Sequence, residues 1–257
     1  MREPIIAGNW KMYKTAPESI VLANAIKRDL FDIDNVEIVL CPPFTSLTDV
    51  KDITGDTNIS FGAQNMFWAE EGAFTGEISP KMLKALGCKY VIIGHSERRA
   101  YFGETNETVN KKVKSALKHG LLPIMCVGEK LEEREAGSAF DVVRDHVENG
   151  LLDVGEKEIL NITFAYEPVW AIGTGKNATP EEAEEIHKFI RGLLSKKYGK
   201  EISENLRIQY GGSVKPDNIE SLIKQKDIDG ALIGGASLNP ESFVEIVKKT
   251  SVVAKEK

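Results

Sequence analysis

Short apolar runs recur along the chain at intervals of roughly thirty residues, the length of one strand-and-helix unit. Most of these runs are continuously apolar, which is typical of parallel strands buried on both faces of a sheet. The pattern predicts strands at Ile5–Ala7, Val36–Leu40, Ile59–Gly62, Tyr90–Ile93, Leu122–Val127, Ile162–Tyr166, Arg207–Tyr210 and Ala231–Ile233.

Helical signals fill the segments between these strands. Thr15 and Glu18 have the spacing of a capping box ahead of an amphipathic stripe. A second stripe runs from Val109 to a glycine at position 120. A third helix is predicted to begin after Thr179, which is followed by a proline and two glutamates.

Strands that alternate with helices predict a parallel sheet covered on both faces. Eight such units in about 250 residues favour a closed (β/α)8 barrel over an open doubly wound sheet, although periodicity alone does not separate the two. No low-complexity linker divides the chain. We therefore expect residues 1–257 to form one α/β domain with a parallel eight-stranded core.

The amino-acid composition and net charge argue against several classes of function. A net charge of −6 argues against a broad basic face for nucleic acid, although a local positive field could still serve an anionic substrate. Cys41, Cys88 and Cys126 form no CxxC pair, so neither a disulfide framework nor a metal site is predicted. The sequence has neither the apolar core of a signal peptide nor a run near the ~20 residues of a membrane span. We expect a cytoplasmic protein with no membrane or nucleic-acid partner.

The most informative stretch is Ala165–Lys176, in which Glu167 ends an apolar strand and a proline follows it. Glycines follow the apolar residues that come after the proline. If these apolar residues were exposed, they would lower the solubility of the protein, so we expect them to close over another part of the protein. One interpretation is a carboxylate base beneath an apolar lid with a hinge at each end. The alternative is an ordinary loop that packs Trp170 on the barrel surface.

Polar residues also follow the first and fourth predicted strands, at the barrel end where such folds carry their chemistry. Asn9 and Lys11 are two residues apart and would project to one side of an extended chain. A lysine reaching solvent is the alternative. His95 precedes a predicted helical turn, whose positive end would disfavour the imidazolium and keep the ring a neutral donor. A structural histidine is the alternative.

Paired glycines follow the last two predicted strands, at Gly211–Gly212 and Gly234–Gly235. Glycines at strand ends allow bare backbone amides to approach an anion, and these two loops are where barrels commonly bind phosphate. Together with Gly173 and Ser213 they predict a phosphate cradle.

The segments that carry these residues closely resemble triosephosphate isomerases. They are Gly8–Met12, Gly72–Glu77, Gly94–Arg99, Ala165–Lys176, Tyr210–Val214 and Gly234–Ser237. They extend from the first strand to the last, so the resemblance covers the whole chain and implies a TIM barrel. It implies an isomerase of glycolysis and gluconeogenesis that interconverts dihydroxyacetone phosphate and D-glyceraldehyde 3-phosphate, with no cofactor and no metal.

In the mechanism that the resemblance implies, Glu167 moves a proton between neighbouring carbons through an enediolate. Neutral His95 polarises the carbonyl, and Lys11 and Asn9 stabilise the oxyanion. The substrate-binding residues would be Asn9, Lys11, Gly173, Ser213, Gly234 and Gly235. The lid would comprise Pro168, Val169, Trp170, Ala171, Ile172, Thr174, Gly175 and Lys176.

Four further residues are expected to support this site. Ile172 on the lid and Leu232 on the eighth strand are the apolar groups that we expect against Glu167. Glu97 is expected to face Lys11, and Cys126 is expected to pack at the end of the fifth strand.

The segment Gln64–Glu77 is long for such a loop and contains Phe74 and Thr75. An exposed aromatic on a projecting loop suggests a subunit contact, and the resemblance implies a homodimer in which this loop reaches the neighbouring active site. Two rival interpretations are another phosphate-binding (β/α)8 enzyme and a barrel that only binds ligands. The presence of Glu167, His95 and Lys11 together weighs against both.

Overall fold

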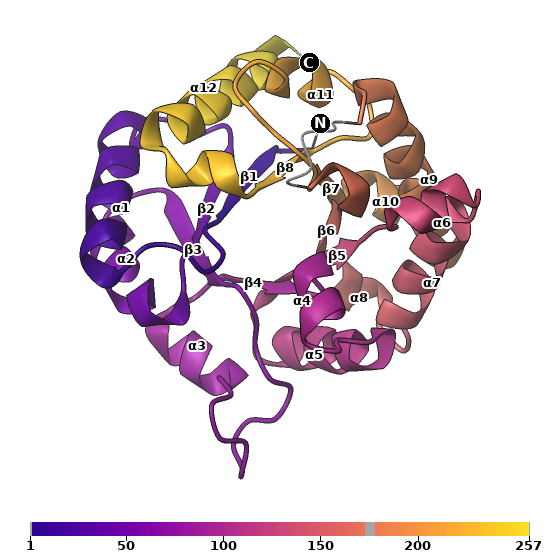
Figure 1. The fold of residues 1–257 in the computed structure, drawn as a ribbon, viewed down its shortest axis with the longest axis horizontal. Helices are drawn as coiled ribbons and strands as arrows, with labels where there is room; N and C mark the ends of the chain where they lie inside the picture. The colour runs from indigo at the N-terminus through magenta and orange to yellow at the C-terminus, as the bar shows by residue number, and fades with distance from the viewer. Residues whose placement is uncertain (1, 173–177, 257) are drawn as a thin grey trace.

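The computed structural model describes residues 2–172 and 178–256. Within these ranges, eight strands close into one parallel barrel in the order β1-β2-β3-β4-β5-β6-β7-β8 (Figure 1). Their bounds are β1 (Ile5–Asn9), β2 (Glu37–Cys41), β3 (Ile59–Ala63), β4 (Tyr90–Ile93), β5 (Leu122–Val127), β6 (Thr163–Tyr166), β7 (Arg207–Tyr210) and β8 (Gly230–Ile233).

The barrel closes where β8 pairs with β1. Ile5 lies opposite Gly230, and Gly8 lies opposite Ile233. The predicted (β/α)8 barrel is therefore confirmed, and the open doubly wound alternative is wrong. Every strand lies within two residues of its predicted bounds, because burial on both faces marks each strand as an apolar run in the sequence.

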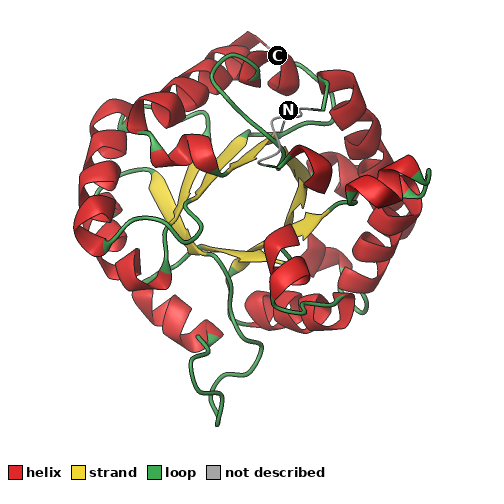
Figure 2. Cartoon of the chain, viewed as in Figure 1, coloured by secondary structure: helices red, strands yellow, loops and turns green. Residues whose placement is uncertain are grey.

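Helices form a ring around the strands (Figure 2). They are α1 (Ala16–Leu30), α2 (Leu47–Thr54), α3 (Pro80–Leu86), α4 (Ser96–Tyr101), α5 (Asn106–Lys118), α6 (Leu131–Glu135), α7 (Ala139–Gly150), α8 (Glu156–Ile159), α9 (Pro180–Tyr198), α10 (Lys200–Asn205), α11 (Ile219–Ile223) and α12 (Pro240–Glu256). Short 3₁₀ helices are η1 (Phe44–Ser46), η2 (Val169–Ala171) and η3 (Gly235–Leu238). None of the described helices combines the length and the apolar character needed to cross a bilayer.

The residues predicted to mark the ends of three helices make the expected contacts or adopt the expected backbone conformation. The backbone N–H and the hydroxyl of Thr15 each donate to the Glu18 carboxylate at 2.8 Å, which fixes the start of α1. The Thr179 hydroxyl accepts the N–H of Glu182 at 3.1 Å at the start of α9. Gly120 has a φ of +68° just beyond α5, a conformation that glycine adopts at low cost.

The side chains of successive strand residues enter two separate apolar cores. Ile5 and Ala7 of β1 belong to the inner cluster that fills the barrel, together with Leu232. Ile6 points the other way and joins the larger cluster between the strands and the helices. The filled interior makes the barrel a rigid frame, so that the loops at its carboxyl end hold chemistry in fixed positions.

The segment between β3 and α3 projects well beyond the ring of helices (Figure 1). Phe67 stacks on Trp68 at a centroid distance of 3.9 Å and contacts Phe74 at 4.4 Å. The Phe67 N–H donates to the Ile78 carbonyl at 2.8 Å, closing the base of the loop. The predicted projecting loop is thus present (Figure 1), and Phe74 within it is 46% exposed.

Candidate functional site

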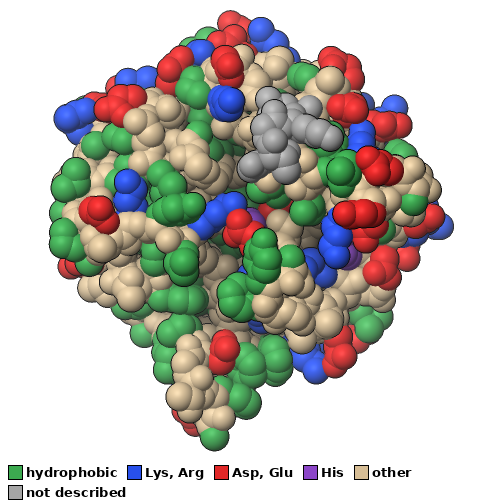
Figure 3. Space-filling model, viewed as in Figure 1, with side chains coloured by type: hydrophobic (Ala, Val, Ile, Leu, Met, Phe, Trp, Pro, Cys, Tyr) green, Lys and Arg blue, Asp and Glu red, His purple; other side chains and the backbone are tan. Residues whose placement is uncertain are grey.

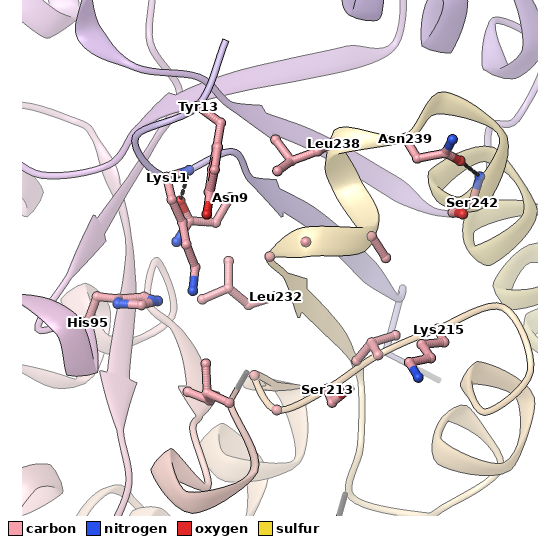
Figure 4. A pocket seen from close by; sticks show the side chains of 17 residues that line it. Asn9, Lys11, Tyr13, His95, Ser213, Lys215, Leu232, Leu238, Asn239 and Ser242 are labelled. Atoms are coloured by element: carbon pink, nitrogen blue, oxygen red, sulfur yellow. Dashed lines mark hydrogen bonds between the residues drawn. The ribbon is translucent and has the colours of Figure 1, made fainter. Parts of the chain in front are cut away.

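The carboxyl ends of the strands surround a pocket of about 550 Å³. It is lined by residues at or just after the carboxyl ends of β1, β4, β7 and β8, including Asn9, Lys11, His95, Ser213 and Leu232. Figure 4 shows the side chains of Lys11, His95 and Leu232 converging on one space. In the space-filling view, basic, acidic and histidine side chains meet in a hollow near the centre of this face (Figure 3).

Lys11 reaches the pocket from a tight turn. Its φ of +52° is unusual for a residue with a side chain, and its N–H donates to Asn9 Oδ1 at 3.0 Å. The Gln64 side chain donates to the Lys11 carbonyl at 2.8 Å and holds the turn in place. The two residues share the pocket as predicted, but the reason is wrong: the chain turns after Asn9 instead of staying extended.

The ammonium of Lys11 is held by Glu97, the second residue of α4. Lys11 Nζ lies 2.6 Å from Glu97 Oε1, so the predicted contact is present. Both side chains are partly exposed, at 22% for Lys11 and 39% for Glu97. The pair therefore fixes the direction of the lysine more than it stabilises the fold.

His95 is the N-cap residue of α4 and is almost completely buried. Its Nδ1 accepts the N–H of Glu97 at 3.2 Å, so the proton of the neutral ring lies on Nε2. Nε2 lies 2.9 Å from Glu167 Oε1. Burial lowers the pKa of His95, but the charge and hydrogen bond of Glu167 together with the charge of Glu97 outweigh burial and raise it above its ordinary value. The neutral imidazole that the sequence predicts for His95 thus stays a prediction, and it applies to a state in which Glu167 has moved away.

Glu167 follows β6, and its carboxylate is bound to the start of α4. The Ser96 N–H donates to Oε2 at 2.9 Å, and the Ser96 hydroxyl lies 3.2 Å from Oε1. Burial raises the pKa of Glu167, but the charge and hydrogen bond of His95 and the Ser96 N–H outweigh it, so the net pKa is lowered. In this position Glu167 is held as a stable carboxylate and a weak base.

The Glu167 carboxylate does not line the large pocket. It lines an adjoining cavity of about 230 Å³, which it shares with Arg99 and His146. Ile172 and Leu232 line the large pocket, and their predicted placement against the carboxylate stays a prediction. The carboxylate lies at Ser96 because the N–H groups at the start of α4 attract it more strongly than an apolar cover does.

Ser96 was missed by the sequence analysis as a partner of Glu167. A signal was available, because Ser96 opens a helix directly after His95, and the first N–H groups of a helix have no partner within it. What the sequence did not contain was the pairing of that helix with a strand end 71 residues away.

The glycine loops after β7 and β8 line the pocket as expected, with Ser213 between them. A Cβ at Gly212 would lie 2.3 Å from the Tyr210 hydroxyl, and one at Gly234 would lie 3.2 Å from Lys11 Cε. Side chains there would thus crowd the loop or the lysine. The start of η3 adds free N–H groups beside the pocket, so this wall can accept an anion. The fourth predicted contact, Gly173, lies outside the described residues.

The first part of the predicted lid packs on the barrel. Pro168 precedes η2, and the Trp170 indole N–H donates to Glu129 Oε1 at 2.8 Å. The Arg134 guanidinium lies over the same indole, 4.7 Å from the ring centroid. The interpretation of a packed Trp170 therefore holds in this conformation. Thr174, Gly175 and Lys176 lie outside the described residues.

Glu129 is a further residue that the sequence analysis missed. Its side chain is completely buried and also accepts the Tyr166 hydroxyl at 3.1 Å. Arg134 supplies a countercharge at 3.4 Å. Glu129 thereby ties the end of β6 to the beginning of the lid segment. No motif in the sequence distinguishes it from a surface glutamate.

Cys126 lies on β5 within the inner core and is completely buried. Burial raises the pKa of this thiol well above its ordinary value, with the Glu167 charge acting in the same direction. The residue is therefore an uncharged packing group. Among the described residues, no group of histidine, cysteine, aspartate or glutamate side chains has the arrangement of a metal site.

The fold and the pocket together define a (β/α)8 barrel that can hold a small anion beside a buried carboxylate and histidine. A family model described as "Triosephosphate isomerase" matches residues 4–250. The chain belongs to the triosephosphate isomerase family.

Several curated relatives share most of this sequence. The triosephosphate isomerase of Carboxydothermus hydrogenoformans is 58% identical over 248 residues, which cover 96% of this chain and 99% of the relative. That of Caldanaerobacter subterraneus subsp. tengcongensis is 57% identical over 247 residues, with the same coverage. That of Dictyoglomus turgidum is 55% identical over 248 residues, covering 96% of this chain and all of the relative.

The contact between His95 and Glu167 predicts a pKa change that NMR can measure. Replacing Glu167 by Gln removes the charge that raises the pKa of His95 but leaves the burial that lowers it. We expect an NMR titration of the ligand-free protein to give a His95 pKa above ~6.5 in the parent chain and a lower one in Glu167→Gln. The stability that this pair contributes is complete between the ordinary pKa values of a glutamate, about 4.5, and of a histidine, about 6.5, and it is lost as the pH falls through the lowered pKa of Glu167 or rises through the raised pKa of His95.

His187 provides an internal control for this titration. It is completely buried, and burial lowers its pKa to about 3 without a contribution from Glu167. Its signal should be the same in both proteins. An unchanged His95 pKa in Glu167→Gln would contradict the proposed charge interaction.

Proposed function

We propose that this chain interconverts dihydroxyacetone phosphate and D-glyceraldehyde 3-phosphate by proton transfer through an enediolate. The observation that carries the proposal is the buried pair of Glu167 and His95, 2.9 Å apart, beside a pocket lined by Lys11 and glycine loops. Family membership over residues 4–250 supports the same reaction. Neither a cofactor nor a metal is required, because the residues named supply an acid, a base and an oxyanion site.

Glu167 is the proposed base. Bound to Ser96 and His95, its carboxylate has a lowered pKa and is a poor proton acceptor. Leaving Ser96 for the large pocket would remove those donors and bring the carboxylate under Ile172 and Leu232, where burial raises its pKa. The base would thus gain strength only where the substrate carbon lies.

His95, Lys11 and Asn9 are the proposed electrophilic groups. The Nε2–H of His95 would face the substrate oxygens once Glu167 has left it, because the Glu97 N–H holds the other ring nitrogen. The ammonium of Lys11 would interact with the oxyanion as well as with Glu97. Asn9 is 5% exposed and fixed by the Lys11 N–H, so it would donate without reorganisation.

The phosphate of the substrate would bind to backbone amides near Ser213, Gly234 and Gly235, with Gly173 as a fourth contact. The lid, Pro168–Lys176, would then close over the intermediate. Closure excludes water, which would otherwise let the enediolate lose its phosphate. Glu129 would act as the fixed point from which the lid moves, since it holds Trp170.

We place the reaction in glycolysis and gluconeogenesis and in the cytoplasm. The three cysteines are all free and buried, in keeping with a reducing compartment. We also propose that residues 1–257 act as a single barrel domain. A barrel that only binds phosphate ligands is disfavoured, because simple binding would not require a buried base beside a histidine.

A homodimer is the second part of the proposal. Apolar side chains remain exposed on the loops at this end of the barrel, among them Met12 at 95%, Tyr101 at 78% and Phe102 at 67%. The loop that carries Phe74 and Thr75 projects beyond the ring of helices (Figure 1). Covering this surface with a second copy of the same loop would bury these groups and bring Phe74 near the partner's Asn9, Lys11 and His95.

The activity predicts a large effect of a small change at Glu167. A coupled assay in both directions should show fast turnover by the parent chain, and a loss of ~10³-fold or more, about 4 kcal/mol, for Glu167→Gln. The matched control is Glu37→Gln, because Glu37 also lies at a strand end but at the opposite end of the barrel. Equal activity in all three proteins would exclude Glu167 as the base.

The dimer predicts a mass of twice the 28.4 kDa chain in light scattering. Phe74→Asp should shift the protein toward the monomer, because a charge would be buried in the interface. Leu160→Asp serves as control, since Leu160 is 53% exposed and lies on another part of the surface. A parent protein that is monomeric at micromolar concentration would contradict this part of the proposal.

A further inference from the structure

A triose phosphate carries a double negative charge and would approach a protein whose net charge is −6. The long-range interaction is therefore repulsive unless the pocket has a local field of the opposite sign. Among the described residues that line the pocket there is no aspartate or glutamate, and there are two lysines, Lys11 and Lys215.

The charge of Lys11 is already balanced in the ligand-free protein. Its ammonium lies 2.6 Å from a carboxylate oxygen of Glu97. Lys215 differs, since no residue within 2–172 and 178–256 forms an ion pair with it. Lys215 is therefore the uncompensated positive charge on the lining of this pocket.

The loop after β7 fixes where this lysine lies. The Lys215 N–H donates to Asn218 Oδ1 at 2.8 Å, and the Asn218 side chain donates to the Ser213 carbonyl at 3.0 Å. These two hydrogen bonds fix the backbone of Lys215 relative to Ser213, on one side of the pocket (Figure 4). The side chain itself is exposed and can follow an arriving anion.

Two acidic residues close to Lys215 in the sequence, Asp217 and Glu220, do not line the pocket. Lys249 pairs with Glu245 at 2.9 Å, and Asp217 and Glu220 add to the charge that raises the pKa of Lys249. Lys249 also donates to the Pro216 carbonyl at 2.7 Å, which brings its ammonium to the base of the same loop. Lys249 thus offsets part of the charge of these acids, and none of them lines the pocket that Lys215 lines.

We propose that Lys215 attracts the phosphate dianion of the substrate to the pocket and strengthens its binding, without contacting the reacting carbons. This role rests on the proposed function for its substrate, a phosphorylated triose. It differs from the role of the backbone cradle, because a mobile ammonium acts over distance, whereas backbone amides act only on contact.

The test compares Lys215→Gln and Lys215→Glu with a control of equal charge, Lys224→Gln. Lys224 follows α11, is exposed and does not line the pocket. At ~10 mM ionic strength, where charges act over ~30 Å, we expect kcat/KM to fall about 3-fold for Lys215→Gln and about 10-fold for Lys215→Glu. The control should match the parent protein, and kcat should be the same in all four.

Two further readouts separate attraction of phosphate from a structural effect. Calorimetric titration with inorganic phosphate at the same ionic strength should show weaker binding by Lys215→Gln and unchanged binding by Lys224→Gln. At ~0.5 M salt the differences should nearly vanish, because the charges are screened within a few ångströms. Turnover of glyceraldehyde, which has no phosphate, should be the same in all the variants.

The proposal is overturned if Lys215→Gln equals Lys224→Gln at low salt, if its loss is independent of salt, or if glyceraldehyde turnover falls equally. Its failure is distinct from failure of the proposed function. A folded parent protein without isomerase activity would refute the function, while the phosphate titration would still decide the role of Lys215.

Discussion

The buried carboxylate of Glu167 is the group on which the rest of the site depends. An ionised carboxylate at 2% exposure is costly unless donors surround it, and here the donors are Ser96 and His95 at the start of α4. The same contacts that make burial tolerable lower the pKa of Glu167 and raise that of His95. The ligand-free site therefore holds its proposed base and its proposed acid against each other at 2.9 Å, and we propose that the two separate before either acts on a substrate.

The barrel makes this arrangement achievable. The functional side chains come from the ends of three strands, β1, β4 and β6, and the filled interior keeps those ends at fixed distances. Around the pair lie groups that each fix one neighbour: Glu97 directs Lys11, and Glu129 holds Trp170 at the start of the lid segment. The glycine loops leave the opposite wall open to an anion. The site is thus a rigid frame around one carboxylate, for which we propose a second position beneath Ile172 and Leu232.

Much of the fold and the chemistry could be predicted from the sequence, because both leave local traces. Strands buried on both faces are apolar runs, and glycines or prolines mark their ends, so every strand was located within two residues. Residues such as His95 and Ser213 stood out by their position at those ends. The orientation of Glu167 could not be predicted, since it depends on the N–H of Ser96, 71 residues away. The left-handed turn at Lys11 and the buried Glu129 were hidden for the same reason, because each depends on contacts with residues distant in the sequence, such as Gln64 and Tyr166.

A crystal structure with a phosphorylated enediolate analogue bound would test the central claim most directly. The account predicts that the Ser96 N–H to Glu167 contact, 2.9 Å in the ligand-free protein, is broken in the complex. The carboxylate should then lie under Ile172 and Leu232, within ~3.2 Å of the analogue atom that replaces the reacting carbon or its oxygen. His95 Nε2 should face the analogue oxygens. An analogue bound in the pocket while Glu167 stays on Ser96 would contradict the account, because no base would then reach the substrate.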